Sequence, residues 1–271
     1  MPVASLPLLL IARLLVPPPA GLPYVTREAD VWELGHGSVP ELPAPEVVPE
    51  FPLLSATGGP DDLGLPVFEP ADDSPRMRNL QRVRDHARER LEAWIEEHGD
   101  EILDRRREPV VHAGELVIGA SRDVPERFYP LDGSSTPQEP ALAESTEEIV
   151  RSVFRYRANG AERDMNPRLV ALLAEAAWFF QAPVTLVSGY RPRQFCTRRQ
   201  SRHIYGAASD VKLDGIPMEI LADFFTIFSD GPYGPMGVGR YPRDGFVHVD
   251  SRDETYFWTG NQPSRRRRPR R

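Results

Sequence analysis

Two of the six histidines in the chain lie near aspartates at spacings that could build a metal site. His203 comes seven residues before Asp210, and His248 comes two residues before Asp250. Imidazole nitrogens and carboxylate oxygens bind zinc, and three protein ligands leave a fourth position open, as catalytic zinc requires. The other four histidines lie in Pro-rich or charged segments, where we expect solvent-exposed side chains: His36, His86, His98 and His112.

Asp210 and His248 lie on segments that are predicted to be strands, residues 208–213 and 245–250. Side chains of a strand alternate between its two faces, so His248 and Asp250 project from the same face. If this strand pairs with residues 208–213, Asp210 and His248 can converge. His203, which arrives through a turn, can then supply the third ligand.

Spacing alone leaves other interpretations open. A histidine on a half-buried strand is more often a hydrogen-bonded core residue, and an aspartate at a strand end usually caps a turn. A non-haem iron site also uses two histidines and a carboxylate. Its familiar order is His-x-Asp followed by a distant histidine, and no histidine follows His248. The single cysteine, Cys196, excludes an internal disulfide, and a thiol ligand or nucleophile is the less favoured interpretation of it.

Four ordered motifs between about residues 165 and 260 resemble the D-alanyl-D-alanine carboxypeptidase and murein endopeptidase superfamily of zinc peptidases. The motifs are Ser188-Gly-Tyr-Arg-Pro192, Ser201-x-His203-x-x-Gly206-x-Ala208-x-Asp210, Gly237-Val-Gly239 and Phe246-Val-His248-Val-Asp250, followed by Trp258. The resemblance implies a hedgehog-type zinc peptidase fold with His203, Asp210 and His248 as the zinc ligands. It does not extend to the first 140 residues.

The resemblance also implies catalytic residues besides the ligands. Arg191 corresponds to an arginine that lies near the substrate's carbonyl or carboxylate in similar enzymes; a salt bridge that fixes the local turn is the alternative. Many relatives place an acidic general base three residues before the last histidine ligand, where this chain has Gly245. Asp244 is slightly favoured as the base, although it could equally serve only the turn. Asp250 either takes the proton or orients a ligand imidazole.

The surrounding sequence predicts an α+β domain. We expect a small, mainly antiparallel sheet with flanking helices around a mononuclear zinc site, preceded by a Pro-rich disordered region and a charged helix. Hydrophobic periodicity and capping residues predict helices over residues 74–107, 145–156, 166–181 and 217–228, and strands at 110–111, 116–118, 184–187, 208–213 and 245–250. The first helix is amphipathic, so its narrow apolar stripe packs on its own domain or on a partner.

The chain is expected to divide into segments of different character. These are a possible export signal at 1–20, a Pro-rich linker at 21–75, the charged helix at 76–107, short strands and a loop at 108–142, a zinc peptidase-like domain at 143–260 and a basic tail at 261–271. The apolar N-terminal run lacks a basic region and is interrupted by Arg13, so export by this element is neither favoured nor excluded. No other window is long enough to span a membrane.

Composition narrows the function classes. The net charge of −7 argues against a general nucleic-acid binder, although six arginines lie within the last seven residues. The leading hypothesis is a periplasmic or secreted zinc metallopeptidase that hydrolyses an amide bond in peptidoglycan stems or cross-links, as a carboxypeptidase or an endopeptidase. The alternative is a non-catalytic, zinc-stabilised module that binds cell-wall peptides or a protein. The sequence does not indicate an oligomeric state.

Overall fold

The computed structural model describes residues 63, 65–67, 73–119, 126–196, 198–231 and 233–260. They lie in the second of the chain's two units, Pro43–Arg271. The possible export signal at 1–20, nearly all of the linker at 21–75 and the basic tail at 261–271 lie outside the described residues. Within the described part, no helix is both long enough and apolar enough to cross a membrane.

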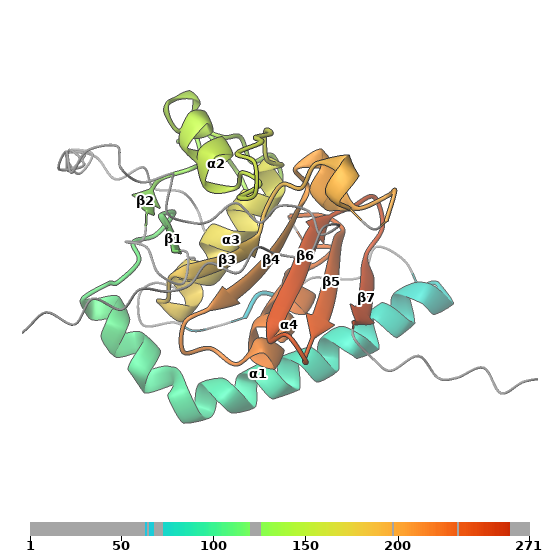
Figure 1. The fold of residues 1–271 in the computed structure, drawn as a ribbon. Coiled ribbons are helices and arrows are strands. Elements are labelled where there is room, and N and C mark those ends of the chain that lie inside the picture. The colour runs from blue at the N-terminus through green and yellow to red at the C-terminus, as the bar shows by residue number, and fades with distance from the viewer. Residues whose placement is uncertain are drawn as a thin grey trace, which may run out of the picture. The chain divides into compact units, whose positions relative to one another are not determined.

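In the described part of the chain, seven strands form one mixed sheet. They are β1 (Leu116–Gly119), β2 (Glu126–Phe128), β3 (Val184–Ser188), β4 (Ala208–Leu213), β5 (Met236–Tyr241), β6 (Phe246–Ser251) and β7 (Tyr256–Thr259). Their order is β2-β1-β3-β4-β6-β5-β7 (Figure 1). The β1–β3 and β5–β7 pairs are parallel and the other four are antiparallel. The expected α+β class is confirmed, but the expectation of a small, mainly antiparallel sheet is corrected to a larger mixed one.

The sheet is larger than predicted because it also contains β2, β5 and β7, of which β2 and β5 carry weak strand signals. β5 contains Gly237 and Gly239, and glycine lowers strand propensity. β2 is three residues long and begins with a charged pair, as is common for a strand at the edge of a sheet. The strand predicted at 110–111 does not form, because the Val111 N–H donates to the Gln181 Oε1 at 3.2 Å instead of joining the sheet.

The described residues contain four α-helices: α1 (Pro75–Arg107), α2 (Glu147–Val153), α3 (Pro167–Phe180) and α4 (Met218–Phe228). Ser74 and Asn166 cap α1 and α3, since each side chain accepts a hydrogen bond from an N–H of the first turn, and proline follows each cap. The helix predicted over residues 145–156 is shorter than expected and has no side-chain cap at its start. A 3-10 turn occupies Glu144–Thr146, and α2 begins after it.

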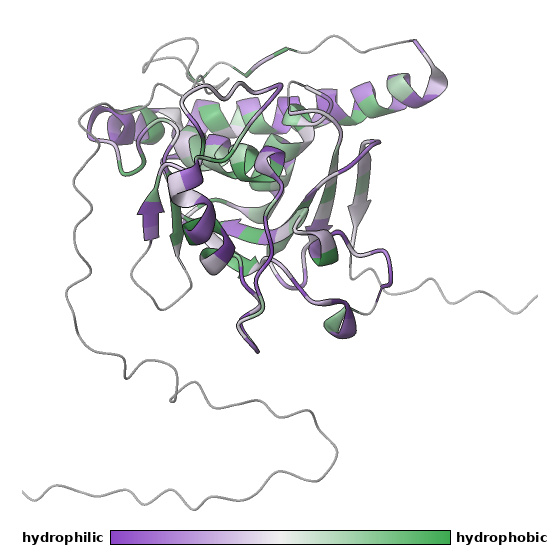
Figure 2. Ribbon diagram, turned by 90° about the horizontal axis from the view of Figure 1, so that it is seen from above, coloured by the Kyte–Doolittle hydropathy of each residue, from purple (hydrophilic) through white to green (hydrophobic). Residues whose placement is uncertain are grey.

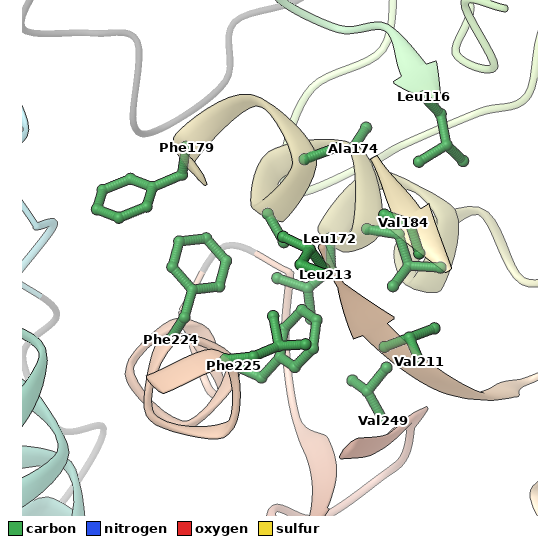
Figure 3. Packing of buried hydrophobic residues seen from close by; sticks show 14 of the residues in the cluster. Leu116, Leu172, Ala174, Phe179, Val184, Val211, Leu213, Phe224, Phe225 and Val249 are labelled. Carbon is green, nitrogen blue, oxygen red and sulfur yellow. The ribbon is translucent and has the colours of Figure 1, made fainter. Parts of the chain in front are cut away.

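The hydrophobic core lies between one face of the sheet and the helices α3 and α4. Figure 3 shows Leu172 of α3 and Phe225 of α4 on the side of the sheet that carries Val211 of β4 and Val249 of β6. All four side chains are fully buried. Because residues alternate along β4 and β6, a buried apolar layer on this face leaves the opposite face for polar side chains.

The charged helix α1 packs along α4. Figure 2 shows hydrophobic residues interspersed among the hydrophilic ones along α1, and the buried members of its apolar stripe include Leu80, Ala87, Leu91 and Ile102. Arg90 of α1 also donates two hydrogen bonds, of 2.8 and 2.5 Å, to the buried carboxylate of Asp223 in α4. Both apolar contact and ion pairing therefore attach this helix to the peptidase-like part of the chain.

Candidate metal centre

The metal-capable side chains lie on the sheet face opposite the core. In the β4–β6 pairing, Asp210 is opposite His248 and Ala208 is opposite Asp250. Residues on the same face of directly paired strands have neighbouring side chains, so the small Ala208 leaves room beside Asp250. The predicted pairing of these two strands, and with it the convergence of Asp210 and His248, is confirmed.

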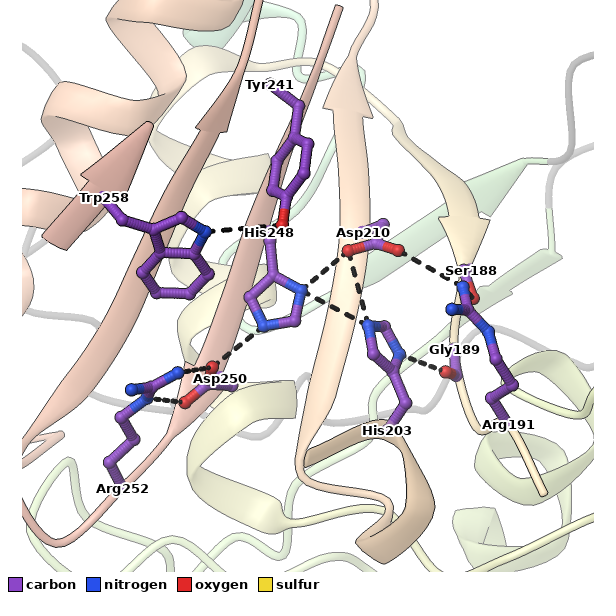
Figure 4. A network of polar contacts seen from close by, with 10 residues as sticks. All are labelled: Ser188, Gly189, Arg191, His203, Asp210, Tyr241, His248, Asp250, Arg252 and Trp258. Carbon is purple, nitrogen blue, oxygen red and sulfur yellow. Dashed lines mark hydrogen bonds and ion pairs between the residues drawn. The ribbon is translucent and has the colours of Figure 1, made fainter. Parts of the chain in front are cut away.

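His203 reaches the same place from outside the sheet. It belongs to a 3-10 turn, Arg202–Tyr205, which directly precedes β4. Its Nε2 lies 3.3 Å from Nδ1 of His248 and 3.4 Å from Oδ1 of Asp210, and His248 Nδ1 lies 2.8 Å from the same oxygen (Figure 4). His203 and Asp210 are buried. The three residues form a group that can hold a metal ion.

The outer nitrogen of each ring has a hydrogen-bond acceptor that fixes its orientation. His203 Nδ1 lies 2.6 Å from the Gly189 carbonyl oxygen, and His248 Nε2 lies 2.8 Å from Oδ2 of Asp250. A carbonyl oxygen only accepts, so Nδ1 of His203 carries a proton. His248 has a carboxylate oxygen at 2.8 Å from each of its nitrogens, so either nitrogen can donate. Neutral His203 then presents a lone pair at Nε2, and His248 presents one at Nδ1 when its proton is on the nitrogen that faces Asp250, which is the arrangement that metal-binding histidines require.

Three lone-pair atoms that face one another need a positive charge between them. Burial lowers the pKa of His248, but hydrogen bonds with Asp210 and Asp250 outweigh that effect and raise it. Burial would likewise raise the pKa of Asp210, but its hydrogen bonds with His203 and His248 lower it overall. The carboxylates therefore stay ionised and attract a cation, which is a proton on His248 or a metal ion.

The spacing of the three donor atoms fits a tetrahedral ion. With metal–ligand bonds of about 2.0–2.1 Å, neighbouring ligand atoms of a tetrahedron lie roughly 3.3–3.4 Å apart. The two distances that involve His203 agree with this value. The distance between Asp210 and His248, at 2.8 Å, is shorter, and these two atoms must separate slightly around an ion. The donor set of two imidazoles and one carboxylate is one that zinc accepts.

Arg191 lies beside this group, as the resemblance implied. Its guanidinium donates to Ser188 Oγ at 2.8 Å and lies 3.6 Å from Oδ2 of Asp210. Its backbone N–H also donates to the His203 carbonyl at 3.2 Å, which ties the loop after β3 to the turn that carries the first histidine. The side chain remains partly exposed in the cavity above the cluster. It can therefore both hold Asp210 and meet a substrate.

Asp250 is fully buried, and both of its oxygens are engaged. Oδ2 faces His248 and accepts from Arg252 Nη2 at 2.7 Å, while Oδ1 accepts from Arg252 Nε. Burial would raise the pKa of Asp250, but the hydrogen bonds with His248 and Arg252 lower it overall. Of its two predicted roles, this geometry fits orientation of the His248 ring better than proton transfer.

The structure does not bring Asp244 to the cluster. Asp244 is exposed in the turn between β5 and β6, four residues before His248. β6 begins at Phe246, so the end of the turn and the first residues of β6 separate Asp244 from His248. The residue is absent from the described lining of the cavity above the cluster, and its backbone N–H donates to the Tyr241 carbonyl as part of the turn. Its position therefore agrees with the alternative that it serves the turn.

A cavity of about 820 Å³ opens above the cluster. Its walls include residues that the motifs did not assign a role, namely Arg198, Gln200, Tyr205, Tyr241 and Arg252. The Cys196 thiol also faces it, donating to the Arg191 carbonyl at 3.6 Å, but the metal-capable group found among the described residues does not include it. Asp210 and Asp250 are the carboxylates of the described lining.

Trp258 forms one wall of the site because β5 has a glycine beneath it. A Cβ atom on Gly239 would lie 2.4 Å from the indole, so only glycine lets the ring cross β5. The indole lies 5.2 Å from the His248 ring and donates to the Tyr241 hydroxyl at 3.3 Å. β5 pairs with β6 so that Gly239 lies opposite His248. Tyr241 lies two residues farther along β5 and therefore on the same face. This pairing is the signal that could have identified Tyr241 as a residue of the site.

Residues 142–250 match the family model described as Peptidase M15. The segment contains all three metal-capable side chains and Arg191. The match confirms the resemblance found in the sequence motifs and supports a peptidase. No curated protein and no solved structure matches the chain significantly.

Proposed function

We propose that the protein is an exported zinc metallopeptidase that hydrolyses an amide bond in the peptide stems or cross-links of peptidoglycan. The observation that carries the proposal is the convergence of His203, Asp210 and His248, with both rings oriented by outer acceptors, inside a segment that matches the Peptidase M15 family model. These three residues would hold the zinc ion. Periplasmic or secreted localisation is part of the proposal, because its substrate lies outside the cytoplasm.

Each neighbouring residue has a task in this reaction. When bound, zinc supplies a Lewis acid that activates water and polarises the scissile carbonyl. Arg191 directs its guanidinium into the cavity, where it can donate to the oxyanion that develops on the substrate. The Gly189 carbonyl and Asp250 hold the two rings, so the ligand set is preorganised. Arg252 keeps Asp250 ionised and in place.

One observation favours the second candidate, a zinc-stabilised module that binds peptides without cleaving them. The described cavity lining offers two carboxylates, and both are already engaged with the histidine rings. Hydrolysis by a zinc peptidase usually uses an acidic residue that takes the proton from water. A site without such a residue can bind a peptide and leave it intact.

Digestion of purified peptidoglycan separates the two candidates. We expect the zinc-loaded protein to release peptide fragments that mass spectrometry detects, and we expect a chelator to abolish the release and added zinc to restore it. The measurement needs parallel metal analysis of the same sample. Zinc bound at one ion per chain with no fragments released would favour the binding module.

A further inference from the structure

A second cavity, of about 480 Å³, adjoins the cavity above the metal centre. Arg191, Asp210 and Phe246 line both of them. An extended peptide advances by about 3.3 Å per residue, so a few residues suffice to pass from one cavity into the other. A peptide whose scissile bond lies at the cluster can therefore place a flanking group in the second cavity.

The second cavity carries positive charge that the protein does not neutralise. Arg155 donates to the carbonyl and hydroxyl oxygens of Ser152 at 2.6 and 3.2 Å, and Arg157 donates to the Leu186 carbonyl at 3.4 Å. These acceptors are neutral, and within the described part of the chain neither guanidinium forms an ion pair with an acidic side chain. Arginine is always protonated in proteins. The two guanidinium groups are therefore available to an anion.

The remaining walls are apolar and suit an amino-acid side chain rather than a bare inorganic anion. Tyr156 and Phe195 stack with their ring centroids 4.8 Å apart. Phe195 and Val187 are each more than two-fifths exposed, although both are hydrophobic. Exposed apolar groups beside unpaired cations match a ligand with an aliphatic part and a carboxylate.

The arginine segment is fixed to the metal centre by its backbone. The Tyr190 N–H donates to the Phe154 carbonyl at 2.8 Å. A Cβ atom on Gly189 would lie 2.5 Å from that carbonyl oxygen, so glycine is needed for the two segments to approach so closely. The Gly189 carbonyl in turn accepts from His203. Arg155 and Arg157 are thus held in a set position relative to the ligand His203, as a specificity site requires.

We propose that the second cavity is a subsite that binds a carboxylate of the peptide chain flanking the scissile bond, with Arg155 and Arg157 as specificity-determining residues. This inference rests on the proposed function, since it assumes a peptide substrate at the metal centre. A peptidoglycan stem with lysine at its third position offers two such groups, the free carboxylate of its glutamate residue and the carboxyl terminus. Guanidinium groups pair with carboxylates through charge-assisted hydrogen bonds, and amidation of the carboxylate removes that pairing.

The test compares three stem pentapeptides with the zinc-loaded, full-length protein. One peptide has both carboxylates free, one is amidated at glutamate and one is amidated at the carboxyl terminus. We expect one amidation to raise KM, or the dissociation constant if no bond is cleaved, by about tenfold. In the double variant Arg155→Gln/Arg157→Gln this penalty should disappear, because the free carboxylate has lost its partners.

A matched double variant, Arg163→Gln/Arg193→Gln, removes the same charge from exposed residues outside both cavities and should keep the penalty. An equal amidation penalty in the parent and in Arg155→Gln/Arg157→Gln overturns the subsite, as does absence of any penalty or of any peptide binding in the parent. Cleavage without discrimination leaves the proposed function standing and removes the subsite. If the parent binds the peptides with the amidation penalty but cleaves none of them, the subsite stands and the proposed function is removed.

Discussion

Two fully buried aspartates on opposite sides of the sheet show what separates a structural ion pair from a functional site. Asp223 of α4 accepts from Arg90 of α1 and from Arg240 of β5, at 2.5 to 2.8 Å. Asp250 of β6 accepts from Arg252 and also from His248. Both carboxylates are 0% exposed. Burial and pairing with arginine are therefore common to the two.

The two aspartates differ in the other groups that their partners contact. Arg90 and Arg240 end their interactions on Asp223 and neighbouring acidic groups, which fastens α1 and β5 to α4. His248 instead contacts Asp250 through Nε2, and its Nδ1 faces Asp210 and His203. Asp250 therefore orients the nitrogen that lies beside the other two metal-capable residues. A site is indicated where oriented lone pairs converge, and a buried charge alone is weak evidence of one.

Removal of the segment that contains α1, and with it the Arg90 partner of Asp223, has the largest expected effect. A chain that begins at residue 140 lacks α1, β1 and β2, so it exposes the apolar surface of α4 and leaves β3 without one neighbour. We expect it to be insoluble, whereas a chain that begins at Ser74 should fold. Solubility and circular dichroism of the two proteins check this expectation, and a soluble, cooperatively folded 140–271 chain would contradict it.

A single substitution at Asp223 should affect stability and leave the metal centre intact. Asp223→Asn leaves two guanidinium groups with a weaker acceptor, and we expect a loss of about 2–4 kcal/mol, reduced from the full buried-pair value because Arg90 is half exposed. Denaturant unfolding measures it, with Asp104→Asn in the exposed Arg107 pair as a control that should change little. If folded Asp223→Asn lost its zinc, the claim that Asp223 serves stability alone would be wrong.

Asp250→Asn should affect the metal first. The amide can still face His248 but no longer offers it a charged acceptor, so zinc affinity should fall by about ten- to a hundredfold, with activity following. Competition with a metal-binding dye gives the affinity. Asp253→Asn, an exposed aspartate beside Arg202, is the matched control. An Asp250→Asn protein that binds zinc normally but has no activity would instead assign proton transfer to Asp250.

Asp244→Asn has the smallest expected effect. Its position in an exposed turn, outside the cavity lining, predicts zinc affinity and turnover within about twofold of the parent, because surface substitutions away from a site usually change little. Initial rates on a peptidoglycan peptide are the measurement. A loss of about two to four orders of magnitude with zinc retained, as expected for a general base, would restore Asp244 as the catalytic residue.

The residues that sequence placed well are those whose geometry depends on local periodicity. Alternation along β4 and β6 put Asp210, His248 and Asp250 on one face, and the β4–β6 pairing bears this out. Caps at Ser74 and Asn166 fixed where α1 and α3 begin. These features follow from contacts between residues that are close in sequence or on directly paired strands.

The features that sequence missed depend on contacts between distant segments. The direction of Asp244 depends on how the β5–β6 turn closes, which the spacing from His248 does not reveal. β5 and β7 pair in parallel although β6 lies between them in the sequence. The glycines of β5 weaken its strand signal, and Gly239 makes room for Trp258. Arg155 and Arg157 come to the site only because Phe154 packs on Gly189.

Metal analysis of purified ligand variants tests the central claim most directly. The parent should contain one zinc ion per chain. His203→Ala, Asp210→Ala and His248→Ala should each lose it, because two remaining protein ligands hold the ion too weakly, and their thermal stability should no longer respond to added zinc. His86→Ala, at an exposed position on α1, should keep the full amount. Full zinc occupancy in any of the three ligand variants would contradict the assignment of that residue and, with it, the metal centre described above.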